Sequence, residues 1–389
     1  MMKLFPDSTQ YLNPYPFFKK MRCEYPVVYD DSQKVWGIYR YEDVNRVITD
    51  YKIFSSDFSQ SNDAQLEQRP KTLLTSDPPL HKNLRNLVSK AFSPKVIQDM
   101  EPRITQIVNE LIDNMKNKNQ IELIQDFAAP LPTIVIAEML GIPTEDRSMF
   151  KNWADQLLRT EGEFNLNNRP DRQTVLEEMN QYFRDIIKQR RTNMGTDLIS
   201  GLICAEIDGE RLSEIELLSF CEVLLLAGHI TTVNLIGNAI WSFTDHPQIM
   251  EQIRCNPAFM PSAIEEVLRY KSPIQLVARV AKQDVKIGDQ MLKEGDRILA
   301  WIGSANHDEN TFENADQFCV NRNPNPHIAF GHGIHFCLGA PLARLEARIG
   351  LTSLLHTFSH MQRNSAIPLE STGSFLIYGL NQLHLEVER

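Results

Sequence analysis

Residues 330–339 read FGHGIHFCLG, and the interpretation of the whole 389-residue chain begins from this segment. Gly331 and Gly333 can adopt backbone conformations that are closed to residues with a Cβ, so the loop can fold tightly beneath a flat cofactor. The residues after Cys337 predict a helix, because Gly339 is followed by alanine and proline. The positive end of that helix favours a thiolate over a thiol, which indicates a cysteine with a chemical role.

Several kinds of site fit such a cysteine. A thiolate bound to haem iron donates electron density and promotes O–O cleavage, which is the chemistry of oxygen activation. His332, His335 and Cys337 could instead hold zinc, although their spacing matches none of the common zinc-finger patterns. A Cys–His nucleophile is a further alternative, and a lone cysteine is usually a small buried hydrophobe without function. We favour haem ligation.

The composition is that of a globular protein which does not bind nucleic acid. Hydrophobic residues make up 42% of the chain and charged residues 23%, with a formal net charge of −10. Phosphate binding needs a concentrated basic face, whereas Lys and Arg are spread along this sequence. Six widely spaced cysteines without a CxxC pair favour a reducing cytoplasm over a disulfide framework. The start, MMKLFPDSTQYLNPYPFFKK, has no apolar run long enough for a signal peptide or a membrane anchor, so we expect a cytoplasmic protein.

The longest predicted element is a helix over residues 213–245. Ser213 and Glu216 form a capping-box pattern at its start, and His246-Pro247 supplies its end. At about 1.5 Å per residue this helix spans on the order of 50 Å. Residues 220–244 are apolar on nearly all sides, which indicates a buried central helix or, with much less support, a membrane span.

The remaining pattern predicts a mainly α (α+β) protein with a minor β-sheet part. Apolar spacing of three and four residues predicts mostly helix over 94–182, with a loop at 165–172. After residue 272 short apolar runs alternate with Gly-Asp turns, which is typical of strands. No repeat, low-complexity tract or linker divides the chain, so we predict a single domain, residues 1–389. The expected strands are 35–39, 276–281, 285–287 and 297–302.

FGHGIHFCLG resembles the haem-binding signature of the cytochrome P-450 superfamily, F-x-x-G-x-[HR]-x-C-x-G, at every fixed position. The following APLARLE is similar to soluble bacterial members. The resemblance implies a haem b cofactor with Cys337 as the axial thiolate ligand of its iron. It also implies a hydrogen bond from His335 to a haem propionate, and places Phe330 and Gly339 in the cofactor site. The implied fold is a helical prism with a long central helix and a small β-rich part, with haem buried between that helix and the cysteine loop.

Two further motifs resemble the family in order and spacing. Glu266 and Arg269 form its E-x-x-R motif, and the resemblance implies a buried network of these two residues with Arg322. An Arg–carboxylate network of this kind would fix the loop that presents the cysteine, which is a structural role. Residues 77–85, DPPLHKNLR, resemble D-P-P-x-H-x-x-x-R. His81 and Arg85 share one helix face there and are implied, together with Arg279, to hold the haem propionates.

Residues 227–232, AGHITT, resemble the family pattern A-G-x-[DE]-T-[TS] midway along the long helix. By resemblance, Thr231 is the alcohol that takes part in proton delivery. The family's acid is replaced by Ile230, which neither accepts nor delivers a proton, so His229, ordered water or a substrate hydroxyl would have to substitute. Back-bonding to its own helix is the neutral interpretation of a threonine at such a position. The positions expected to serve catalysis or the cofactor on this helix are Ala227, Gly228, His229, Thr231 and Thr232.

The implied activity is the insertion of one oxygen atom from O2 into a C–H bond of a small hydrophobic molecule, such as a fatty acid, steroid or terpenoid. Electrons would come from NAD(P)H through a separate ferredoxin or flavodoxin with its reductase, and Lys82, Lys90 and Arg344 are candidates for the docking face. The alternatives are a peroxide-driven enzyme, an enzyme that rearranges an oxygenated substrate, or a haem or ligand carrier. The candidate substrate-pocket residues are Leu73, Leu224, Ile274, Val277, Leu376 and Ile377.

Overall fold

The computed structural model describes residues 4–61, 71–158, 170–207 and 209–389. Within them the chain is mainly helical with several small sheets, as the sequence predicts. The α-helices are α1 (Tyr15–Glu24), α2 (Tyr41–Thr49), α3 (Leu80–Ser89), α4 (Pro94–Asp99), α5 (Glu101–Asp113), α6 (Pro130–Met139), α7 (Arg147–Leu158), α8 (Pro170–Thr192), α9 (Leu198–Cys204), α10 (Glu214–Asp245), α11 (Pro247–Cys255), α12 (Met260–Tyr270), α13 (Ile302–Ala305) and α14 (Ala340–Thr357). The strands are β1 (Val27–Asp30), β2 (Val35–Ile38), β3 (Phe54–Ser55), β4 (Gln120–Glu122), β5 (Glu206–Ile207), β6 (Glu210–Arg211), β7 (Val277–Ala281), β8 (Val285–Ile287), β9 (Gln290–Leu292), β10 (Arg297–Ala300), β11 (His360–Arg363), β12 (Glu370–Ser371), β13 (Leu380–Gln382) and β14 (His384–Glu388).

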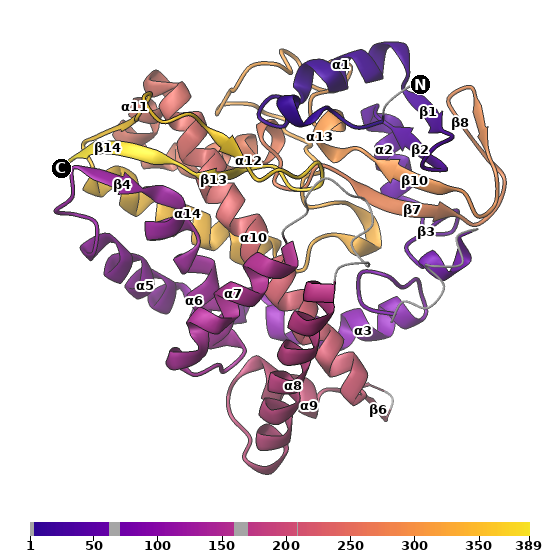
Figure 1. The fold of residues 1–389 in the computed structure, drawn as a ribbon, viewed down its shortest axis with the longest axis horizontal. Coiled ribbons are helices and arrows are strands. Elements are labelled where there is room, and N and C mark those ends of the chain that lie inside the picture. Colours follow the sequence, from indigo (N-terminus) through magenta and orange to yellow (C-terminus); the bar gives the residue numbers. More distant parts are fainter. Residues whose placement is uncertain (1–3, 62–70, 159–169, 208) are drawn as a thin grey trace.

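Helix α10 runs through the middle of the molecule and packs against α6, α12 and α14, among others (Figure 1). Its start is the predicted capping box, in which the Ser213 hydroxyl accepts from the Glu216 N–H and the Glu216 carboxylate accepts from the Ser213 N–H. The helix is long and apolar enough to cross a membrane, yet 71% of its most apolar window is buried inside the protein. Burial of most of its surface explains its apolar sequence, as expected of a central core helix.

The largest sheet of the described residues has the strand order β1-β2-β10-β7-β3 and lies to one side of α10 (Figure 1). The parallel pair β2–β10 joins the N-terminal hairpin β1–β2 to the later antiparallel pair β7–β10, with Val35 opposite Arg297. Arg279 belongs to strand β7 of this sheet, and its side chain is largely buried.

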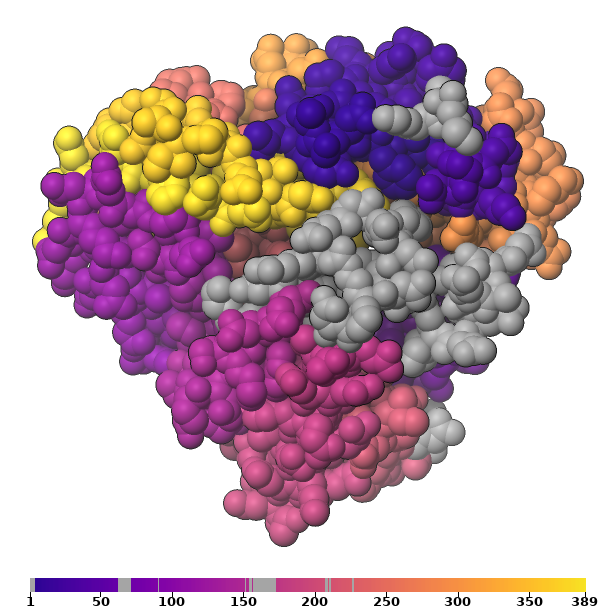
Figure 2. All heavy atoms as spheres, in the orientation of Figure 1, coloured from indigo at the N-terminus to yellow at the C-terminus, as the bar shows by residue number. Residues whose placement is uncertain are grey.

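Chain segments far apart in sequence meet on the face seen in Figure 2, where the N-terminal region lies beside the C-terminal strands. The rings of Phe5 and Phe375 are 4.7 Å apart, and the Tyr378 hydroxyl donates to the Leu12 carbonyl over 2.8 Å. Helices α5 and α14 pack closely on the opposite side of α10.

Some local predictions are wrong. Strand β4 interrupts the stretch predicted to be mostly helical, and helices α1 and α2 lie in a region for which no helix was predicted from the sequence. The strand expected at 297–302 ends at Ala300, since Ile302 already begins α13. Residues 170–172 of the expected loop belong to α8, and 165–169 lie outside the described residues.

Candidate functional site

The cysteine loop has the tight backbone that its glycines predict. Gly331 and Gly333 adopt φ values of +71° and +69°, which side chains with a Cβ rarely adopt. A Cβ on Gly333 would also lie 3.2 Å from the Cα of Thr49 in α2, so the loop packs closely on that helix. The Cys337 N–H donates to the Phe330 carbonyl over 2.9 Å, which closes the loop on itself.

Cys337 lies immediately before α14, whose N-cap is Gly339. Burial raises the pKa of the Cys337 thiol, whereas the N–H groups of Gly339 and Ala340 and the charges of Arg85 and Arg344 lower it. The N–H groups are the positive end of the helix and favour negative charge at the sulfur. Burial therefore opposes the free thiolate, and a bound metal ion is the partner that would stabilise this charge.

Glu266 and Arg269 form a fully buried ion pair in α12, with N···O distances of 2.8 Å at both carboxylate oxygens. Arg322 contacts the same carboxylate at 3.2 Å, and the Cys319 N–H donates to it over 2.8 Å. Arg269 also donates to the carbonyls of Asn306, Ala315 and Gln317. The structure thus brings together the three residues singled out in the sequence, and they anchor the segment that leads into the cysteine loop.

A second ion-pair network, absent from our sequence predictions, adjoins this one. Arg344 in α14 donates to both oxygens of Glu265 over 2.7 and 2.8 Å, and His327 contacts the same carboxylate at 3.0 Å. The guanidinium of Arg344 also lies over the Phe330 ring, 4.6 Å from its centroid. We expected Arg344 to belong to the docking face. The ion pair was not predicted because Glu265 is 79 residues away, and no local pattern indicates such a partner.

Four nitrogen-bearing side chains gather on the other side of the loop: His81, Arg85, Arg279 and His335. The rings of His81 and His335 are 4.3 Å apart. Burial, and then the charges of Arg279, His81 and Arg85, lower the pKa of His335 to about 3. Burial lowers the pKa of Arg279 to about 10. The cluster therefore repels additional positive charge and favours an anion.

Within the described residues, the arginines of this cluster form no ion pair with an acidic side chain. The buried Nε2 of His81 has no hydrogen-bond partner. Among the described residues, no carboxylate forms an ion pair with Arg85 or Arg279, and Asp77 instead pairs with Lys282 at 3.3 Å. Unpaired buried charge is costly, and although Asp77 acts electrostatically on His81 and Arg279, a further anionic group would stabilise the cluster. Two carboxylates of a flat cofactor seated on Cys337 would supply this charge.

The residues expected on α10 lie at the centre of the helix. Thr231 donates to the Ala227 carbonyl over 2.8 Å, which is the back-bonding geometry. His229 and Thr232 are buried, whereas Ile230 and Gly228 are partly exposed. The Thr231 oxygen keeps its lone pairs for a further partner, because the back-bond uses only its proton.

The candidate substrate-pocket residues lie in different parts of the structure. Ile274 forms a β-bridge with Ile377, and the Gln275 N–H next to it donates to the Leu376 carbonyl over 2.9 Å. These two segments therefore lie side by side. Leu73 and Leu224 belong to the large hydrophobic core, and Val277 packs against a second core at the sheet. By resemblance, residues 56–74 are also expected to contribute to the pocket, and residues 62–70 of this loop lie outside the described residues.

The zinc and nucleophile interpretations of the loop lose their support. No group of three or more His, Cys, Asp or Glu side chains could hold a metal ion in the part of the chain that the structure describes. His332 Nδ1 contacts the Asn45 side chain at 2.9 Å, and His335 Nε2 contacts the Ser56 hydroxyl at 2.9 Å. The two histidines thus face different partners, neither of which is Cys337. Of the docking candidates, Lys82 is exposed, and the side chain of Lys90 lies outside the described residues.

Comparison with known proteins identifies the family of the chain. A family model described as "Cytochrome P450" matches residues 5–256 and 258–384. The putative cytochrome P450 YjiB of Bacillus subtilis is 42% identical over 379 residues, covering 96% of this chain and 94% of that protein. The crystal structure of CYP109B1 from Bacillus subtilis superposes with a TM-score of 0.87 at 41% identity, covering 97% and 100%. CYP109E1 from Bacillus megaterium in complex with corticosterone has a TM-score of 0.88 at 37% identity, covering 97% and 99%.

Proposed function

Because the chain belongs to the cytochrome P450 family, it is a monooxygenase-type oxidoreductase that binds haem b, and we propose that Cys337 is its axial thiolate ligand. Haem with a thiolate ligand supplies the cleavage of the O–O bond and the transfer of one oxygen atom to a substrate. The observation that carries the assignment is the placement of Cys337 at the start of α14, beside a basic cluster without acidic partners.

In this proposal, different groups of residues hold different parts of the cofactor. His81, Arg85, Arg279 and His335 bind the two propionates, which relieves the repulsion within their cluster. Phe330, the first residue of the loop, packs against the large hydrophobic core. A Cβ on Gly339 would meet no atom within 4 Å, whereas a Cβ on Gly228 would lie 3.4 Å from the Ile136 side chain, so Gly228 allows close packing of α10 on α6. Ala227 and Gly228 are the family's small positions facing the cofactor in this proposal. The Glu266–Arg269–Arg322 network positions the loop without touching the substrate.

Proton delivery falls to Thr231, whose oxygen is free to accept a hydrogen bond while its proton is held by Ala227. Ile230 carries no titratable proton, so the relay must be completed by ordered water, by His229 or by a hydroxyl of the substrate. Thr232, buried next to Thr231, supports the helix on its inner side. This incomplete relay favours substrates that bring a polar group of their own.

The substrate class is a small hydrophobic molecule with at least one hydroxyl or carbonyl group, of steroid size. Two observations support this class: the apolar character of Leu73, Leu224, Ile274, Val277 and Ile377, and the corticosterone complex of a relative that is 37% identical. Leu376 lies beside the Ile274–Ile377 bridge, where its carbonyl accepts the Gln275 N–H. Electrons come from NAD(P)H through a separate ferredoxin or flavodoxin and its reductase, to a single cytoplasmic haem domain that spans residues 1–389.

The test is reconstitution of the purified holoenzyme with NAD(P)H, a bacterial ferredoxin and its reductase, against a panel of steroids, fatty acids and terpenoids. The expected result is a product that carries one atom from 18O2, most readily from a steroid. The same product from hydrogen peroxide alone, with none from the ferredoxin system, would favour the peroxide-driven alternative. Haem binding without product in either system would favour a carrier.

A further inference from the structure

The network of Glu265, Arg344 and His327 joins three separate parts of the chain. Glu265 lies in α12, Arg344 in α14, and His327 in the segment that enters the cysteine loop. Burial acts to raise the pKa of Glu265, but the hydrogen bonds from Arg344 and His327 lower it to about 2. The carboxylate is therefore ionised, and both oxygens are used to hold the Arg344 guanidinium in one plane.

The guanidinium of Arg344 lies over the ring of Phe330. The guanidinium carbon lies 4.6 Å from the ring centroid, within the range of a cation–π contact. The Phe330 carbonyl, in turn, accepts the Cys337 N–H over 2.9 Å. A continuous path of contacts therefore leads from the Glu265 carboxylate through Arg344 and Phe330 to the backbone of Cys337.

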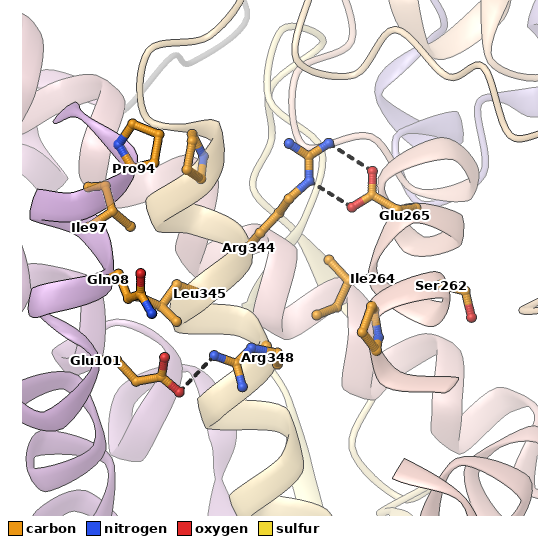
Figure 3. Close-up of a pocket in the computed structure, with 12 residues that line it drawn as sticks. Pro94, Ile97, Gln98, Glu101, Ser262, Ile264, Glu265, Arg344, Leu345 and Arg348 are labelled. Carbon is orange, nitrogen blue, oxygen red and sulfur yellow. Dashed lines mark hydrogen bonds and ion pairs between the residues drawn. The ribbon is translucent and has the colours of Figure 1, made fainter. Parts of the chain in front are cut away.

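Figure 3 shows that Arg344 lines a surface groove together with a similar arginine one turn later, Arg348. Arg348 pairs with Glu101 of α5 at 2.9 Å, and it is about as exposed as Arg344, at 42% against 36%. Within the described residues, Arg348 forms no hydrogen bond, ion pair or cation–π contact with the cysteine loop. The two arginines thus share helix, groove and ion-pair chemistry, and differ in their contact with Phe330.

We propose that Arg344 is a positioning residue that fixes the ring of Phe330, the first residue of the cysteine loop, and thereby sets the reduction potential of the haem. The proposal rests on the proposed role of Cys337 as the haem ligand. Hydrogen bonding and charge around a coordinating sulfur tune the potential of its metal centre. A guanidinium fixed at two points controls both the ring position and the local charge, whereas the flexible ammonium of lysine supplies charge alone.

The test uses charge-conserving variants of the full-length holoenzyme. Arg344→Lys and Glu265→Asp keep every charge but break the two-point pairing that orients the guanidinium over Phe330. The matched controls, Arg348→Lys and Glu101→Asp, make the same changes in the other pair of the groove. The ferric–ferrous potential of each variant is measured by spectroelectrochemical titration, alongside its thermal unfolding midpoint and its reduced carbon monoxide spectrum.

We expect Arg344→Lys and Glu265→Asp each to change the ferric–ferrous equilibrium constant by about threefold or more. At 59 mV per tenfold for one electron, this is a shift of about 28 mV or more. The two controls keep the wild-type potential. Lower unfolding midpoints with unchanged potentials would assign Arg344 a merely structural role and overturn the proposal, as would equal shifts in the controls.

The carbon monoxide spectrum distinguishes a wrong assignment of Cys337 as haem ligand from a wrong assignment of Arg344 as positioning residue. A wild-type protein without the red-shifted band of thiolate-ligated haem would contradict the assignment of Cys337 itself. A wild-type band together with unshifted potentials in both Arg344→Lys and Glu265→Asp would contradict only the role of Arg344. Glu265→Asp is the milder change, so it provides the reading if Arg344→Lys does not retain haem.

Discussion

The carboxylate of Glu266 and the guanidinium of Arg269 face each other at 2.8 Å with neither side chain exposed to solvent. A buried ion pair pays a large desolvation cost, which is tolerable only when every hydrogen-bonding position is filled. Here Arg269 also holds three backbone carbonyls, and Glu266 also holds Arg322 and the Cys319 N–H. The pair therefore acts as the junction between α12 and the long segment that leads to Cys337.

Replacing Arg269 by Met should destabilise the fold strongly, because Glu266 loses its two-point partner and three carbonyls lose their donor. Breaking a buried pair costs about 3–5 kcal/mol. Urea unfolding of the holoenzyme, together with haem content after purification, measures the effect. Lys293→Met, which removes an exposed ion pair with Asp284, should change little. An unfolding free energy for Arg269→Met equal to that of this control would contradict the role of the network.

His81→Leu and Arg279→Met should weaken haem binding without unfolding the protein, because each removes a group expected to hold a propionate. A hydrogen bond to a charged group contributes about 1.5–3 kcal/mol, so haem release should quicken by roughly tenfold or more. Transfer of haem to an excess of apomyoglobin measures the rate. Arg297→Met is the control, since Arg297 lies in the neighbouring strand β10 and donates to the Lys34 carbonyl. Unchanged release from both variants would place the propionates elsewhere.

Ile230→Asp should restore a proton donor beside Thr231 and lower the peroxide released per NAD(P)H consumed. General acid–base groups contribute roughly 10²-fold or more to a proton transfer, so even an imperfectly placed acid should be visible. Ile230→Asn has nearly the same size but no titratable proton and serves as the control. Thr231→Ala should raise peroxide release. If the aspartate and asparagine variants release the same amount, the missing acid is not what limits proton delivery.

Lys271 should destabilise the protein at neutral pH. Burial lowers the pKa of its ammonium from 10.5 to about 7, although the Trp241 ring 3.2 Å away stabilises the charge. The unfolded state then binds the proton more tightly, so stability rises with pH between about 7 and 10.5. Lys271→Met should therefore raise the urea midpoint at pH 7.5, and raise it less at pH 9.5.

Lys286→Met provides the comparison for Lys271→Met, because Lys286 is an exposed lysine whose removal should alter stability little at either pH. A gain for Lys271→Met that is the same at both pH values would show that the buried charge is not its cause. A loss of stability at pH 7.5 would show that the contact of the ammonium with the Trp241 ring outweighs its desolvation.

The parts of the fold that the sequence predicts well are those encoded by local patterns. The capping box at Ser213 and the stop at Pro247 define α10 without reference to the rest of the chain. Gly331 and Gly333 likewise predict a tight loop from local sequence, and both have positive φ in the structure. By contrast, β4 is a strand only because β14, more than 250 residues later, pairs with it, and this pairing leaves no periodic signal in three residues.

The same distinction holds for the site. The Glu266–Arg269 contact follows from a spacing of three residues on a helix, and a known motif reveals it. The Glu265–Arg344–His327 network depends on three distant segments, and each of its residues resembles an ordinary surface charge when considered alone. His335 was expected to hold a propionate, but the sequence did not predict that His81 would stack beside it at 4.3 Å. Such contacts follow from tertiary packing, which a local pattern does not contain.

Ligation of haem iron by the Cys337 thiolate can be tested with the absorption spectrum of the reduced protein bound to carbon monoxide. The wild-type protein should have a strongly red-shifted Soret band, and Cys337→Ala should lose this band while retaining its helical content by circular dichroism. Cys319→Ala, at an exposed cysteine, should keep the wild-type spectrum. A wild-type protein without haem, or the same red-shifted band after Cys337 is removed, would contradict the account.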